Sequence, residues 1–166
     1  MAAFTGTPVN SSLMANQKDA DATGARADSL AVDAKLHAAY VLYTHAAAQG
    51  NGTGEIDMVR LPPGRLRIIN DLCRVVSSAM AANADLHIGT RAFTNLDGTA
   101  VAEDDNRFAD NLDAGGGVLD QIWPLPLGGV VELNSREGID VYCLVDTGNI
   151  ETGDTISLLC AYQKIG

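Results

Sequence analysis

From Lys35 onward, short apolar runs alternate with clusters of Gly, Pro, Asn and Asp. This texture is typical of an all-β sandwich or barrel, in which each run is one strand and each cluster is one turn. We therefore predict an antiparallel β-sandwich of about eight strands with jelly-roll-like connectivity. The expected strands are Leu36–Ala46, Ile56–Leu61, Arg65–Val76, Ala84–Phe93, Val118–Trp123, Gly129–Asn134, Ile139–Val145 and Thr155–Lys164.

The second and third of these strands are predicted to pair as a hairpin. Pro62-Pro63-Gly64 lies between them, where proline removes ladder donors and glycine supplies the positive φ that a tight turn needs. Asn70-Asp71 interrupts the third strand and indicates a bulge or a change of sheet.

A long polar connection, residues 95–117, follows the fourth strand. Within it, the segment Glu103–Leu112 is predicted to make one short helix, because Phe108 and Leu112 are spaced i and i+4 and could pack inward together. Gly115-Gly116-Gly117 would end this helix.

The first 33 residues differ from the rest, because Ala, Ser, Thr, Asn, Asp and Gly dominate and apolar residues are scattered. Such a segment cannot bury enough surface to fold alone. We expect residues 1–33 to be a flexible N-terminal arm on a sandwich domain of residues 34–166. It is either a mobile terminus or an extended arm ordered on a neighbouring subunit, and a short helix within residues 16–33 is a weaker alternative. The expected anchors are Phe4, Val9, Leu13 and Met14.

Length and charge limit the classes of function that this chain is expected to have. A chain of 166 residues is enough for one core, and no stretch approaches the roughly 20 apolar residues of a membrane helix. No basic segment is followed by an apolar run and a cleavage site, so the chain is expected to be soluble and untargeted. The formal charge of −10 would repel a nucleic-acid backbone, so neither nucleic acid nor membrane is expected as a partner.

The candidate chemical sites are weak. Acidic residues gather between Asp97 and Asp113, but they are consecutive and lack the alternate spacing of a calcium loop. His37, His45 and His87 stand apart, although two could meet if the first and fourth strands were neighbours. Cys73, Cys143 and Cys160 each lie in an apolar run and are expected to be buried free thiols from a reducing cytoplasm. We therefore predict no catalytic, cofactor-binding or metal-ligating residues and no enzymatic activity.

A contact role is expected around the single tryptophan. Trp123 stands beside Pro124 and, with Leu125 and Leu127, forms apolar material at a predicted sheet edge that a monomer would leave partly exposed. These three residues are the expected core of a subunit contact, most simply in a symmetric trimer. Aromatic residues make up 5% of the chain, which argues against a carbohydrate groove lined by stacking rings.

Several segments carry a family resemblance. Four segments resemble small β-sandwich structural proteins of tailed bacteriophages. They are the stretch Glu55–Leu66, the strand Ala84–Thr90, the Asp- and Asn-rich loop after it and the closing Gly153–Leu158. Among these the chain is similar to capsid decoration, or cement, proteins over about residues 35–166.

The resemblance implies a virion protein that is made in the host bacterial cytoplasm. It implies attachment to the outer surface of an icosahedral head, often as a trimer, with the major capsid protein as partner. The alternatives are a tail or head-fibre component and a calcium- or carbohydrate-binding β-sandwich module. An acidic surface would also be unfavourable beside packaged DNA.

Overall fold

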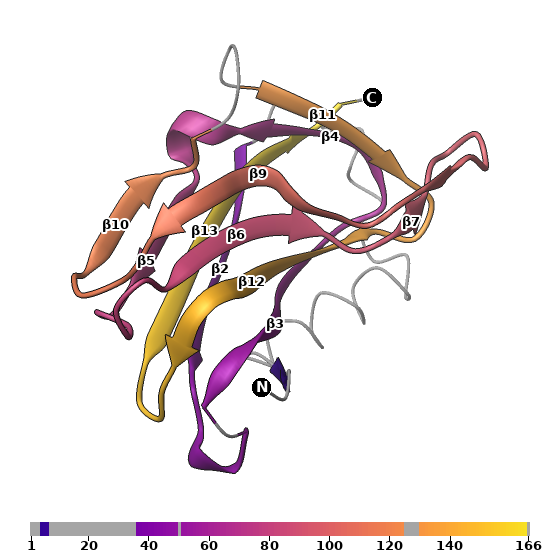
Figure 1. Ribbon diagram of the computed structural model, residues 1–166. Coiled ribbons are helices and arrows are strands. Elements are labelled where there is room, and N and C mark those ends of the chain that lie inside the picture. Colours follow the sequence, from indigo (N-terminus) through magenta and orange to yellow (C-terminus); the bar gives the residue numbers. More distant parts are fainter. Residues whose placement is uncertain (1–3, 7–35, 50, 125–129, 166) are drawn as a thin grey trace.

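The computed structural model describes residues 4–6, 36–49, 51–124 and 130–165, and these form an all-β sandwich of two main sheets (Figure 1). The predicted fold class is therefore confirmed. The first sheet has the order β1 (Phe4–Gly6), β3 (Gly52–Leu61), β12 (Ile139–Ile150), β6 (Asp85–Thr90) and β9 (Asp104–Asp113). The second contains β2 (Leu36–Thr44), β13 (Thr155–Lys164), β4 (Gly64–Ile69), β5 (Arg74–Ser77), β10 (Leu119–Ile122) and β11 (Val130–Ser135).

The second sheet is built around β13. On one side β13 pairs with β2 along nearly its whole length, from Thr155↔Thr44 to Gln163↔Leu36. On its other side it pairs first with β5 and then with β4. These two short strands thus follow one line, broken by the 3-10 turn η3 (Asn70–Leu72). The interruption predicted at Asn70-Asp71 is this turn, and the chain stays in the same sheet across it.

The outer strand of this sheet is broken in the same way. Strand β10 pairs with β5, and β11 pairs with β4, both antiparallel. The second sheet is thus completed by segments widely separated in sequence. The two remaining strands, β7 (Phe93–Thr94) and β8 (Ala100–Val101), pair with each other in a small hairpin that projects beyond the sandwich (Figure 1).

The predicted hairpin between β3 and β4 is wrong. Strand β3 pairs with β1 and β12 in the first sheet, whereas β4 pairs with β11 and β13 in the second. Pro62 and Pro63 lie at the crossing, and neither has the backbone N–H that would extend a ladder. Gly64, with φ of +113°, then starts the new strand, so this segment changes sheet instead of folding back.

The predicted helix at Glu103–Leu112 is also wrong, because this segment forms β9 and pairs with β6. Phe108 and Leu112 are both buried, as expected, but an i, i+4 spacing places two residues on one face of a strand as well as of a helix. The edge of β6 supplies backbone partners that the segment would otherwise have to find within itself. Two register shifts between β6 and β9 accommodate its irregular pattern.

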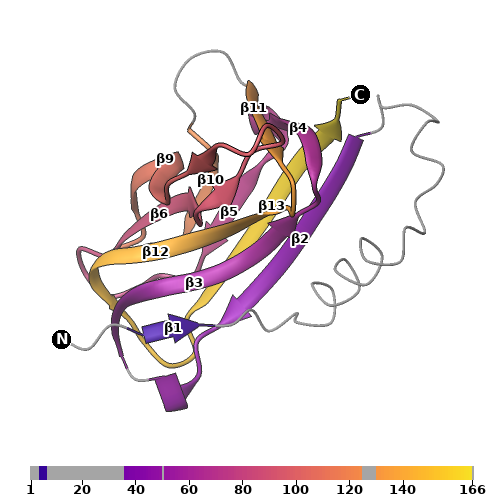
Figure 2. The ribbon, with the colours of Figure 1, turned by 90° about the vertical axis from the view of Figure 1, so that its right-hand side faces the viewer.

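The core lies between the sheets and follows the period of two. Val141, Cys143 and Val145 of β12 are buried, as are Ile156 and Leu158 of β13. No helix in the described part of the chain is long and apolar enough to cross a membrane. Figure 2 shows β1 lying alongside β3, and β2 running along the side of the second sheet.

Candidate interaction surfaces

The outer face of the first sheet is acidic. Along β12, the side chains of Asp140 and Asp146 on this face are half-buried or exposed, whereas Tyr142 between them is buried. Neighbouring elements contribute more carboxylates to this face. The acidic face, as we define it, consists of Glu55, Asp57, Glu103, Asp110, Asp140 and Asp146.

Arg91 ties three of these carboxylates together. Its Nε donates to Asp57 Oδ1 at 2.8 Å, and its Nη1 donates to Glu103 Oε1 at 3.1 Å and also to Glu55. The side chain is only 22% exposed, so these ion pairs are partly shielded from water. Burial by itself would lower the pKa of Arg91, but the hydrogen bonds to Glu55 and Asp57 outweigh it and hold that pKa above its ordinary value.

Tyr142 forms the floor of this cluster. The Arg91 guanidinium lies 4.1 Å from the centre of the Tyr142 ring, a cation–π distance. Burial, with Glu103 and Glu55 nearby, raises the pKa of Tyr142 well above its ordinary value. The contacts of Arg91 and Tyr142 therefore connect β3 and β12 with the segment that follows β6 and the segment that precedes β9.

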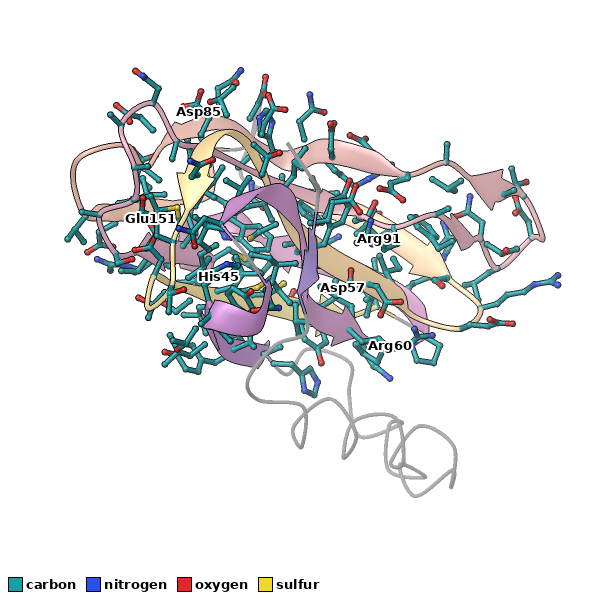
Figure 3. The ribbon with its side chains drawn as sticks, turned by 60° about the horizontal axis from the view of Figure 1, so that its bottom comes forward. His45, Asp57, Arg60, Asp85, Arg91 and Glu151 are labelled. Atoms are coloured by element: carbon teal, nitrogen blue, oxygen red, sulfur yellow. The ribbon has the colours of Figure 1, made fainter. Side chains whose placement is uncertain are left out.

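A second arginine closes the neighbouring end of the face. Arg60 donates from Nη1 to both oxygens of Asp140, at 3.1 and 2.8 Å, and from Nη2 to the Glu137 carbonyl at 2.6 Å. Arg60, Asp57 and Arg91 lie near one another in Figure 3. The charged groups on this face are therefore held in fixed positions by one another, as suits a surface that presents a constant pattern to a partner.

His87 lies farther along the same face, on β6, which is paired with β12 on one side and β9 on the other. It is 7% exposed, with Nδ1 at 3.0 Å from Asp110 Oδ1 on β9 and Nε2 at 3.8 Å from Asp146 Oδ2 on β12. Each ring nitrogen thus faces a carboxylate of a different neighbouring strand, although neither makes a hydrogen bond of regular geometry.

The second sheet carries exposed ion pairs on its far side, Arg67–Glu132 and Arg74–Asp120, but its β2 edge is apolar. Leu36, Tyr40 and Leu42 of β2 are 52%, 51% and 42% exposed, and we call these three residues the apolar edge. In register, Tyr40 is opposite Leu159 of β13, so the apolar surface continues inward from the edge strand. No Asp, Glu, Lys, Arg or Pro occurs in β2. It therefore lacks the charges and prolines with which proteins usually protect an edge.

The predicted contact residues fall in three different settings. Trp123 is 2% exposed and packs 4.9 Å from the Phe108 ring, so its burial needs no partner. The exposed apolar residues near it are Val118 and Ile122. Phe4 lies in β1, whose backbone pairs with β3 in the same chain. The other predicted residues, Val9, Leu13, Met14, Leu125 and Leu127, lie outside the described residues. A contact role for these positions stays a prediction.

The acidic residues described next, between positions 97 and 113, make separate local contacts. Asp97 Oδ1 accepts a hydrogen bond from Thr99 N at 2.8 Å, which lowers the pKa of Asp97. Asp113 Oδ1 accepts from Gly115 N at 2.9 Å, and Asp104 pairs with Arg107 at 3.2 Å. Among the described residues, no group of three or more His, Cys, Asp or Glu side chains is arranged to hold a metal ion.

The histidines are not brought together. His37 stacks on Tyr162 with ring centres 5.3 Å apart, and His45 Nδ1 lies 2.9 Å from the Tyr43 hydroxyl. The first and fourth predicted strands, β2 and β6, belong to different sheets. Sequence reasoning also missed the Arg91 cluster. The alternation of Glu55 and Asp57 on one strand face was a signal for it, but nothing local identifies the arginine that pairs with them.

The three comparisons with known proteins give a fold but no family. No family description matches the chain, and no curated protein matches it. Among solved structures, it is similar to a chain of the capsid of Ralstonia phage GP4, at 15% identity and a TM-score of 0.55, over 81% of this chain and 88% of that one. At this identity the likeness establishes a shared fold.

Two more distant structures are also viral. A chain of the cyanophage Pam1 capsid asymmetric unit is 14% identical with a TM-score of 0.43, over 78% of this chain and 84% of that one. A chain of infectious bursal disease virus, Gx strain, is 12% identical with a TM-score of 0.40, over 80% of this chain and 33% of that one. Likenesses at these scores are too distant to support an inference.

Proposed function

We propose that this chain is a structural protein of a tailed-bacteriophage virion, which binds the outer surface of the capsid and stabilises it. The observation that carries the proposal is the fold shared with a chain of the Ralstonia phage GP4 capsid over more than four-fifths of both chains. Because the coverage is high in both directions, the two chains have similar lengths. The likeness therefore extends over a whole domain and is not confined to one common motif.

The strand order supports this proposal. When β4–β5 and β10–β11 are each counted as one broken strand, the second sheet has the order β2, β13, β4–β5, β10–β11. The first sheet, apart from β1, has the order β3, β12, β6, β9. Two four-stranded sheets with these crossings favour a jelly roll, an architecture common among viral capsid domains. Since one fold serves many functions, the surfaces must supply the rest of the argument.

The charge distribution favours the outside of the shell. With a net charge of −10, the chain would be repelled by DNA packed within the head. The fixed carboxylates of the acidic face suit a basic or polar patch on a major capsid protein, whereas the apolar edge suits contact between copies of this chain, as in a trimer.

Add-back to particles lacking the chain tests the proposal. Virions made from a phage genome with this gene deleted are mixed with the purified protein, sedimented, and imaged by cryo-electron microscopy. We expect saturable binding, density on the outside of the head, and a higher temperature of DNA release. Binding confined to the tail or a fibre would contradict the capsid assignment, and complete absence of binding would contradict a virion role on the finished particle.

A further inference from the structure

The fold brings two cysteines that are far apart in sequence into one cross-strand position. In the antiparallel pairing of β13 with β5, Leu159 is opposite Arg74. The next position in this register places Cys160 opposite Cys73, at the junction between η3 and β5. Both side chains are fully buried and belong to the core side of the second sheet.

The sulfur of Cys73 is in contact with the backbone beside Cys160. Cys73 Sγ accepts a hydrogen bond from Ala161 N at 3.2 Å and lies 3.6 Å from Ala161 O and 3.3 Å from Ile69 O. Residues directly opposite each other on antiparallel strands have Cβ atoms about 4.5–5.5 Å apart. A disulfide needs about 3.5–4.5 Å, so a small local adjustment is sufficient to close the bond.

We propose that Cys73 and Cys160 form an intrachain disulfide when the protein meets an oxidant, and that this bond locks the central strand β13 to the start of β5. This modification site does not depend on the proposed virion function. It extends the prediction of buried thiols, because buried thiols and a disulfide are the two redox states of the same pair.

The two thiols are not equivalent. The hydrogen bond from the Cys160 thiol lowers the pKa of Cys73 despite burial, and Ala161 N–H adds to the effect. The same interaction, together with burial, raises the pKa of Cys160. We assign Cys73 as the attacking thiol because its sulfur also accepts the Ala161 N–H hydrogen bond at 3.2 Å, which favours the thiolate.

The reaction is a thiol–disulfide exchange with a small-molecule disulfide as the oxidant. The Cys73 thiolate attacks one sulfur of that molecule, forms a mixed disulfide and releases one small thiolate. Cys160, after losing its proton, attacks Cys73 Sγ and displaces the second small thiolate. The protein loses two protons and two electrons, and the oxidant is reduced to two small thiols.

Access to the buried pair is through η3. Asn70 is 2% exposed, and neither its side-chain nitrogen nor its oxygen has a hydrogen-bond partner in the described structure, which makes this turn costly to keep closed. Leu72, next to Cys73, is 47% exposed. Cys143 provides an internal comparison: it lies on β12 in the other sheet, and burial raises its pKa to about 12.

The test uses the full-length protein incubated with excess oxidised glutathione. We expect intact mass to fall by two hydrogen atoms and alkylatable thiols in denaturant to fall from three to one. Peptide mapping without reduction should link the peptides of Cys73 and Cys160 and find Cys143 alkylated. The oxidised protein should also melt at a higher temperature than the reduced protein.

Variants sharpen the result. Cys160→Ser should abolish the cross-link, whereas Cys143→Ala should retain it. If either variant does not fold, the peptide map of the wild-type protein still shows whether Cys73 and Cys160 are linked. The oxidation must last longer than the time in which the amides of Cys73 and Ala161 exchange their hydrogens. Three free thiols after that time would overturn the proposal. A disulfide that involves Cys143 or a second molecule would also overturn it.

Discussion

Gly89 has no room for a side chain in this structure, because the start of β9 passes directly over it. A Cβ built at Gly89 would lie 2.2 Å from Asp104 O and 2.6 Å from Asp105 Cα. Gly89→Ala must therefore push β9 away from β6, and we expect the free energy of unfolding to fall by about 1–3 kcal/mol, as is usual for overpacking.

Urea denaturation measures this loss. Gly117→Ala is the matched control, because a Cβ there meets nothing within 4 Å, and we expect a change of at most about 0.5 kcal/mol. Equal stability of the two variants would mean that β9 is not held against β6 at this point.

Tyr142 makes stability depend on alkaline pH. Because burial and nearby Glu103 raise its pKa in the folded state, the folded protein keeps the phenol proton after the unfolded chain has lost it. The stabilisation is complete below the unfolded pKa of about 10 and is lost progressively as pH rises above that value.

Denaturant titrations at several pH values between about 8.5 and 11 test this dependence. We expect Tyr142→Phe to lose less stability over this range than the wild type. Tyr40→Phe, at a half-exposed position on β2, is the control and should follow the wild-type slope. An unchanged slope in Tyr142→Phe would refute the assignment.

At the scale of elements, the sequence predicts strands better than it predicts their partners. Alternation identified β6 because one of its faces is buried along its whole length. The same rule failed at Pro62-Pro63, where the residues of a tight turn instead mark a crossing between sheets. It also failed at Phe108 and Leu112, whose spacing fits a strand and a helix equally well. Both errors arose because the strand that pairs with the segment is distant from it in sequence.

The apolar edge carries a prediction about self-association. Leu42→Lys places a charge on an edge strand that has none, and it should lower the self-association of the purified protein with little change in melting temperature. Sedimentation velocity over a range of concentrations measures the effect. Asn106→Lys adds the same charge at an exposed site on β9 and serves as the control. A similar decrease in both variants would indicate general charge repulsion and not edge pairing.

At the scale of the whole molecule, sequence reasoning gave the class and the approximate strand count but not the surfaces. The acidic face assembles Glu55 of β3, Asp110 of β9 and Asp140 of β12 from three strands, and no local pattern specifies that these strands share one sheet. The pairing of Cys73 with Cys160 was hidden for the same reason.

Removal of the N-terminal segment is a prediction at this scale. Residues 1–33 are poor in apolar groups, and within the described chain β1 pairs with only three residues of β3. A protein beginning at Ala34 should therefore melt close to the temperature of the full chain but bind phage particles more weakly, if the arm contributes to attachment.

Thermal denaturation and particle sedimentation separate the outcomes of this truncation. Unfolding of the shortened protein would place the segment in the fold. Unchanged binding to particles would refute the arm as an attachment element.

The central position of β13 also sets an order of events during synthesis. Strands β2, β4 and β5 all pair with it, yet it follows them all in the sequence. A ribosome adds about 5–20 residues each second, so β2 waits on the order of 10 seconds before its partner emerges. During that interval its uncharged, apolar strand is open to any nascent chain on the same messenger RNA, and crowding along a polysome becomes the first hazard this protein meets.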